Sequence, residues 1–186
     1  MNNILNIKDK EEFREWLSQN ISKEEECYLL LKRGKPKDDN VFYYLDAVEV
    51  ALCFGWIDST LTKINGINYQ RFSKRNKNTI WSELNKERVR RLERLGLMTD
   101  EGRKVLPDMD INHYQIDNDL IKIMEDNNMY EIFKSFPVLY QRVRSYNITF
   151  YKNKDINIYN KAIEHFIKET KKGKMYGNWN DYGRLK

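Results

Sequence analysis

The chain has 186 residues, of which 40% are hydrophobic and 33% are charged, and its net charge is +5. This length fits one domain, or a domain with a small appendage, and the 13% of aromatic residues excludes a disordered chain. The longest apolar runs, such as Val50–Phe54, are far shorter than the ~20 residues of a membrane-spanning helix. No export signal is visible at the start of the sequence, so we expect a cytoplasmic protein.

The cysteines and histidines predict neither a disulfide nor a metal site. Cys27 and Cys53 lie in separate apolar segments, and a lone cytoplasmic pair is seldom a structural disulfide, so we expect buried free thiols. His113 and His165 lie in unrelated contexts, and no two of these four residues have metal-ligand spacing. The sequence also has no glycine-rich phosphate loop, and we expect no metal and no cofactor.

Charge is distributed in blocks of opposite sign. Residues 71–104 contain eleven basic and five acidic residues, whereas residues 105–135 contain two basic and seven acidic residues. Residues 168–186 contain six basic and two acidic residues. Blocks of opposite sign in one folded chain usually complement one another or face solvent, and a basic patch for an anionic partner is the less favoured interpretation.

In the first part of the chain, local signals alternate between helix and strand. A capping box at Asp9 followed by an amphipathic stripe predicts a helix that ends near Asn20. The apolar run 27–31 predicts a buried strand, and a polar loop follows at 34–40. Helical spacing resumes at Tyr44, and Gly55 is placed to end that helix in a left-handed conformation.

The clearest local signal is a β-hairpin. Asn65-Gly66 lies between two β-prone runs, and this dipeptide favours a two-residue hairpin turn. If Ile64 pairs with Ile67, the register extended outward makes Asp58 and Arg71 diagonal neighbours on one face of the sheet.

The remainder of the chain is predicted to be helical, without internal repeats. We expect helices from about 79–82 to Leu95, from Thr99 to Pro107, over 119–135, after Pro137, and from about Ile156 to Gly173. Residues 108–118 are a polar connection, and we expect the tail, 174–186, to be partly loose.

Together these elements predict an α+β fold. A small antiparallel sheet around the hairpin at about 57–72, with the 27–31 strand, is surrounded by about six helices. We expect a single domain over 1–186, with a motif-bearing part at 1–110 and a helical part at 119–173.

Four blocks in the middle of the chain resemble one known family. They are Cys53-Phe54-Gly55-Trp56-Ile57-Asp58, Tyr69-Gln70-Arg71-Phe72-Ser73-Lys74-Arg75, Ile80-Trp81-Ser82-Glu83-Leu84-Asn85-Lys86-Glu87-Arg88-Val89 and Gly96-Leu97-Met98-Thr99-Asp100-Glu101-Gly102. Their order and spacing are similar to those of the bacterial YdeI/OmpD-associated family, also called the bacteriocin-protection family. The sequence departs from that family at Lys74, where a proline is usual, and at Asp100-Glu101, where Pro-Ala is usual. The resemblance implies protection against bacteriocins or cationic antimicrobial peptides, a role in stress response, and no known reaction.

The polar and aromatic members of these blocks form a candidate ligand pocket. An Asp–Arg pair beside a tryptophan and two amide or hydroxyl groups suits a small anionic or amide-bearing ligand, because arginine offers a planar, bidentate fork. We favour the structural interpretation over the pocket, with a cross-strand Asp–Arg pair and a serine that caps a helix. The candidate residues are Asp58, Arg71, Arg75, Trp81, Ser82 and Asn85.

Three classes of function remain open at this point. We favour a protein that acts by binding a small molecule or a protein partner. The segment from Lys86 to Arg94 followed by Thr99–Leu106 imitates a helix-turn-helix, but its second helix is acidic at the start, so nucleic-acid binding through the basic 71–104 region is the weaker alternative. An enzyme acting on a small anionic substrate, with Asp58 as base, is the third.

Overall fold

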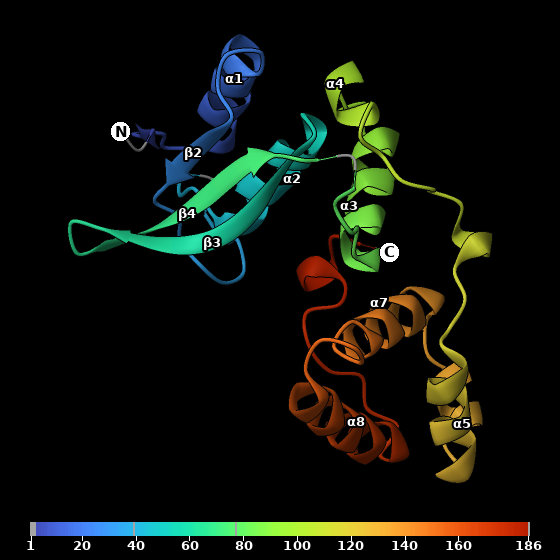
Figure 1. Ribbon diagram of the computed structural model, residues 1–186. Helices are drawn as coiled ribbons and strands as arrows, with labels where there is room; N and C mark the ends of the chain where they lie inside the picture. The colour runs from blue at the N-terminus through green and yellow to red at the C-terminus, as the bar shows by residue number, and fades with distance from the viewer. Residues whose placement is uncertain (1–2, 39, 77, 186) are drawn as a thin grey trace. The chain divides into compact units, whose positions relative to one another are not determined.

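A computed structural model describes residues 3–38, 40–76 and 78–185 and confirms the α+β class. Over these residues the chain forms a four-stranded mixed sheet and eight α-helices, two more than the sequence indicated. The residues cluster into two compact units, which are described separately (Figure 1). Unit 1 comprises Met1–Ile80 and Glu87–Pro107, and unit 2 comprises Trp81–Lys86 and Asp108–Lys186.

The sheet belongs to unit 1. Its strands are β1 (Ile4–Leu5), β2 (Glu26–Leu29), β3 (Trp56–Ile64) and β4 (Ile67–Lys74), in the order β1-β2-β4-β3. β1 is parallel to β2, and the other neighbours are antiparallel. Figure 1 shows the β3–β4 hairpin extending well past the two shorter strands.

The hairpin turns where the sequence predicted. Ile64 pairs with Ile67, and the two residues between them have positive φ angles, 49° at Asn65 and 83° at Gly66. This is the conformation of a type I′ turn, which Asn-Gly adopts readily because glycine carries no Cβ and asparagine tolerates the left-handed region.

Two helices cover one face of the sheet. α1 (Lys10–Asn20) begins at Asp9, whose carboxylate accepts the Glu12 N–H at 2.8 Å, as the capping signal predicted. The Phe13 ring of α1 lies 5.6 Å from that of Phe72 on β4. α2 (Tyr44–Cys53) is buried along most of its length and ends before Gly55, which has a φ of 73°.

A close backbone contact fixes the end of unit 1. α4 (Asp100–Arg103) is capped by the Thr99 hydroxyl, which also donates to the Cys53 carbonyl at 2.6 Å. A Cβ at Gly102 would lie 2.2 Å from that same carbonyl oxygen. Glycine is therefore required at this position, which explains why the fourth motif block ends on it. Cys53 and Cys27 are both free and buried, as expected.

Unit 2 is helical. Its helices are α5 (Asn118–Asp126), α6 (Tyr130–Lys134), α7 (Val138–Thr149) and α8 (Ile156–Lys171). The single helix predicted over 119–135 is wrong, because the chain breaks at Asn128, which adopts a left-handed φ of 56°. Asparagine tolerates that conformation better than most residues, so the break costs little conformational free energy. Phe133 and Phe166 meet at 5.3 Å in the core that these helices enclose.

The segment that we expected to be partly loose contributes to the packing of unit 2. Leu185 is buried against Leu139 and Val143 of α7. The Arg144 guanidinium lies 3.8 Å from the centre of the Tyr176 ring. Aromatic and aliphatic residues near the end of the chain therefore hold the tail in place. None of the helices formed by the described residues is long and apolar enough to cross a membrane.

α3 (Glu83–Arg94) crosses the boundary between the units, since residues up to Lys86 belong to unit 2 and residues from Glu87 to unit 1.

Candidate functional site

The expected Asp58–Arg71 pair does not form. The predicted register holds from Ile64 to Leu61, but an irregularity then shifts it, so that Asp58 pairs with Phe72 rather than with Ser73. Successive residues of a strand point to opposite faces, so Asp58 lies on the face of Phe72 and Arg71 lies on the other. A bulge, which local sequence did not signal, therefore overturns this part of the prediction.

Arg71 instead pairs across the sheet with Glu26 of β2. Its Nε donates to a Glu26 carboxylate oxygen at 2.7 Å, and its Nη1 donates to the Ser59 hydroxyl at 3.0 Å. The guanidinium holds the pKa of Glu26 below its usual value. Both side chains are about one-third exposed, so this pair is a surface ion pair.

Asp58 accepts a hydrogen bond from Tyr44 of α2 at 2.5 Å. Burial raises the pKa of the Tyr44 phenol, and the adjacent carboxylate raises it further. The Arg33 guanidinium lies over the Tyr44 ring at 4.0 Å and donates to the Gln70 side chain at 2.5 Å. Sequence reasoning missed Tyr44 and Arg33, because neither lies in a hairpin strand.

The other four predicted residues divide between the units. In unit 1, Arg75 follows β4 and its side chain is buried. The backbone N–H of Arg75 donates to the Gly55 carbonyl at 2.9 Å. Unit 2 contains Trp81, which is buried, and Asn85, which is half-buried. The Ser82 hydroxyl accepts the Asn85 N–H at 3.2 Å, so it caps α3 as the structural alternative held.

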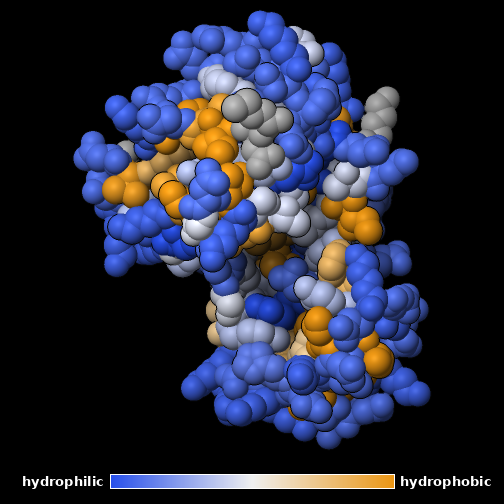
Figure 2. Space-filling view, turned by 60° about the vertical axis from the view of Figure 1, so that its left-hand side comes forward, coloured by the Kyte–Doolittle hydropathy of each residue, from blue (hydrophilic) through white to orange (hydrophobic). Residues whose placement is uncertain are grey.

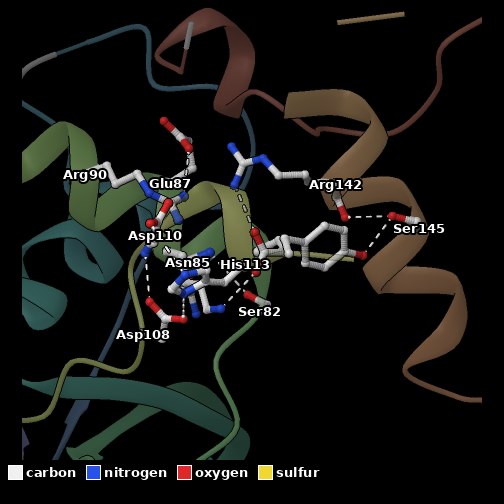
Figure 3. Close-up of polar contacts among 12 residues, drawn as sticks. Ser82, Asn85, Glu87, Arg90, Asp108, Asp110, His113, Arg142 and Ser145 are labelled. Atoms are coloured by element: carbon white, nitrogen blue, oxygen red, sulfur yellow. Dashed lines mark hydrogen bonds and ion pairs between the residues drawn. The ribbon is translucent and has the colours of Figure 1, made fainter. Parts of the chain in front are cut away.

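A buried ion pair lies at the centre of the polar residues of unit 2. Arg142 of α7, labelled in Figure 3, donates to Glu83 at 2.9 Å. The two side chains are 7% and 2% exposed. Lys86 lies 3.0 Å from the other carboxylate oxygen of Glu83. Sequence reasoning missed Glu83, although it stands between two of the predicted residues, because glutamate at a helix start is normally exposed.

Further polar residues extend this cluster. Tyr114 and Ser145 are joined at 2.8 Å, and burial raises the pKa of Tyr114 to about 12. His113, at the surface, lies 2.6 Å from Asp108, which raises the pKa of the imidazole (Figure 3). The buried members are hydrogen-bonded to one another, an arrangement that fixes structure.

The basic region from 71 to 104 is largely neutralised by neighbouring carboxylates. Of its eleven basic residues, Lys77 lies outside the described residues. Among the described residues, ion pairs are formed by Arg71, Lys74, Lys86, Arg90, Arg91, Arg94, Arg103 and Lys104. No observation here favours the nucleic-acid alternative.

An open groove of about 480 Å³ lies beside α1 in unit 1. That volume is within the range of ligand sites. The residues that line it are Glu11, Arg14, Glu15, Ser18, Phe54 and Thr99. Most of the surface that they expose in the groove belongs to apolar atoms.

Two exposed carboxylates and an aromatic ring give this groove its chemistry. Glu11 and Glu15 are one helical turn apart, so they lie on the same side of α1. Arg14 also lines the groove, and its guanidinium is engaged there, since it donates to the Leu97 carbonyl at 2.8 Å and lies 5.2 Å from the Phe54 ring centre. An apolar floor with an acidic rim suits a lysine or arginine side chain, whose stem is apolar and whose head is cationic.

Comparison with known proteins identifies one family. The family model described as "Domain of unknown function (DUF8412)" matches residues 5–105. This range covers most of unit 1, including all the residues of the groove. No significant match was found among curated proteins or among solved structures.

Proposed function

This chain belongs to the DUF8412 family, a domain of unknown function, and we propose that it binds cationic, amphipathic peptides. It acts by binding rather than by turnover, and its biological role is to protect the cell against bacteriocins or antimicrobial peptides under stress. We place this activity in the cytoplasm.

The observation that carries the proposal is the acidic, apolar groove beside α1. Phe54, part of which the Arg14 guanidinium covers, and the apolar stems of the lining residues form the floor, and Glu11 and Glu15 offer carboxylates for the charged head of a basic side chain. A volume of about 480 Å³ accommodates one or two such side chains of a longer peptide. The groove is open, so the rest of the peptide can continue along the surface.

The family resemblance of the sequence supports the same proposal. All four blocks that resemble the YdeI/OmpD-associated family lie within residues 5–105, the range that the family model matches. Phe54 and Thr99, which line the groove, are members of the first and fourth blocks. The protective role that the resemblance implies and the groove thus concern the same part of the chain.

A titration with a labelled cationic amphipathic peptide tests the binding. We expect saturable binding that weakens with added salt, and a several-fold weaker affinity for Glu11→Gln/Glu15→Gln, because each exposed ion pair contributes about 0.2–1 kcal/mol. The matched control is Glu125→Gln/Glu164→Gln, which removes two exposed carboxylates from unit 2. Equal loss in both double variants, or no binding by the wild type, contradicts the proposal.

The biological role is tested separately in cells. Deletion of the gene should increase sensitivity to cationic peptides, and the wild-type gene should restore resistance better than the Glu11→Gln/Glu15→Gln gene. Unchanged sensitivity on deletion rules out the protective role for this protein, whatever the titration shows.

A further inference from the structure

Two exposed segments of unit 1 carry an excess of positive charge. The connection between β2 and α2 contains Lys32, Arg33, Lys35 and Lys37, which outnumber the two carboxylates that follow them, Asp38 and Asp39. Residues 59–70, which form most of the hairpin, contain Lys63 as their one charged residue. All five side chains are exposed, and none of them takes part in the ion pairs that neutralise the 71–104 region.

Aromatic and amide side chains hold the loop cations in place. Arg33 stacks over Tyr44 at 4.0 Å and donates to Gln70, whose side chain is otherwise buried. Lys32 lies 5.7 Å from the centre of the Tyr43 ring. The base of the loop is therefore ordered, which means that its charges are presented at a defined position on the sheet.

The hairpin places apolar residues next to these charges. Leu61 pairs with Gln70, the partner of Arg33, so Leu61 lies on the same face of the hairpin as the loop. Leu61 is 55% exposed, and Lys63, two residues along β3, shares its face. Figure 1 shows the hairpin projecting, and Figure 2 shows that hydrophobic residues gather among hydrophilic ones on one face.

We propose that this surface, formed by Lys32, Arg33, Lys35, Lys37, Lys63 and Leu61, docks unit 1 on a membrane surface that contains anionic lipids. Anionic headgroups attract the cations, and the exposed Leu61 side chain enters the boundary between headgroups and acyl chains. Neither interaction requires a spanning helix.

The chemistry of the surface favours a lipid surface over a nucleic acid. Binding of single strands relies on exposed aromatic rings on which bases stack. Beside this loop, however, Tyr43 is buried and Tyr44 is covered by Arg33. The exposed apolar residues of the hairpin tip are aliphatic.

Co-sedimentation of the full chain with vesicles tests the inference. Phosphatidylcholine vesicles serve as the neutral surface, and mixed phosphatidylcholine–phosphatidylglycerol vesicles as the anionic surface. We expect binding to the mixed vesicles that falls with salt, and a loss of more than about tenfold in Lys35→Ala/Lys37→Ala, since each cation near an anionic surface contributes about fivefold. Leu61→Ser should also weaken binding.

A matched control separates a specific surface from net charge. Lys161→Ala/Lys174→Ala removes two exposed lysines from unit 2 and should bind as the wild type does. Absence of wild-type binding to the mixed vesicles, equal binding to neutral vesicles, or equal loss in the control overturns the inference. Binding of the same surface to a single-stranded nucleic acid or to an acidic polypeptide, with no vesicle binding, overturns it as well. The peptide titration contains no vesicles, so its failure is distinguishable from failure here.

Discussion

A buried charged pair in unit 2 and a set of exposed charges in unit 1 show two opposite uses of charged side chains. In unit 2, Glu83 and Arg142 are almost completely buried and lie 2.9 Å apart, with Lys86 as a further partner. In unit 1, Glu11 and Glu15 are exposed at the rim of a groove, and the cations of the β2–α2 loop are exposed as well. One set of charges is enclosed by partners, and the other faces solvent.

This difference separates residues that stabilise the fold from residues that are available to a ligand. A buried charge must keep its partner, because an unpaired charge in the interior is strongly unfavourable. An exposed carboxylate contributes little to stability, so its replacement affects binding without unfolding the chain. The comparison therefore predicts which substitutions lower stability and which lower affinity.

The largest effect is expected for Glu83→Gln, which leaves the buried Arg142 guanidinium without its carboxylate. We expect a loss of about 3–5 kcal/mol in the free energy of unfolding, measured by denaturant titration. Glu131→Gln, at an exposed position 4.0 Å from Lys134, is the control and should change stability by less than about 0.5 kcal/mol. Similar effects from the two substitutions would remove the distinction between buried and exposed charges.

A smaller effect is expected for Tyr44→Phe, which removes the hydrogen bond to Asp58. The carboxylate is half-buried and loses one donor, so stability should fall by about 1–2 kcal/mol while peptide affinity is unchanged. Tyr151→Phe removes an exposed hydroxyl from unit 2 and should be close to neutral. A change in peptide affinity for Tyr44→Phe would extend the binding site beyond the groove.

A double-mutant cycle tests the partner of Arg71. Arg71 and Glu26 should couple by less than about 1 kcal/mol after solvent screening, and Arg71 and Asp58 should not couple measurably. Because the pKa of Glu26 is lowered in the folded state, its contribution is present above its ordinary value near 4.5 and is lost as pH falls through the folded pKa. Coupling between Arg71 and Asp58 would contradict the observed register and support the one that the sequence predicted.

The smallest effect concerns His113 and its dependence on pH. Asp108 raises the pKa of His113 above 6.5, so the pair stabilises the protein below that pH and the contribution disappears as pH rises through the raised pKa. His113→Asn should therefore lower the melting temperature slightly at about pH 5 and leave it unchanged at about pH 9. Asp108→Asn should show the same dependence, and a difference that persists at the higher pH would contradict this explanation.

Local sequence signals predicted the fold where one short-range interaction determines it. Asn65-Gly66 specified the hairpin turn, and Asp9 specified the start of α1, because each acts on the backbone beside it. The bulge that separates Asp58 from Arg71 has no such local cause, so the predicted register failed beyond Leu61.

The candidate site was harder to predict because its members are distant in sequence. The groove joins Glu11 and Glu15 to Phe54 and Thr99, which only the tertiary structure brings together. The buried pair of Glu83 and Arg142 spans 59 residues. The motif blocks identified Ser82 and Asn85 on either side of Glu83, but they gave no reason to expect the glutamate itself to be buried.

Chemical-shift mapping with a cationic amphipathic peptide tests the central claim most directly. The account predicts that the largest shifts occur at the amides of α1 between Glu11 and Ser18 and at Phe54 and Thr99, and that the shifts decrease in Glu11→Gln/Glu15→Gln. The amides around Glu83 and Arg142 should move little. Shifts concentrated around Glu83 and Arg142, with none along α1, would contradict the assignment of the groove and of the two roles of charge.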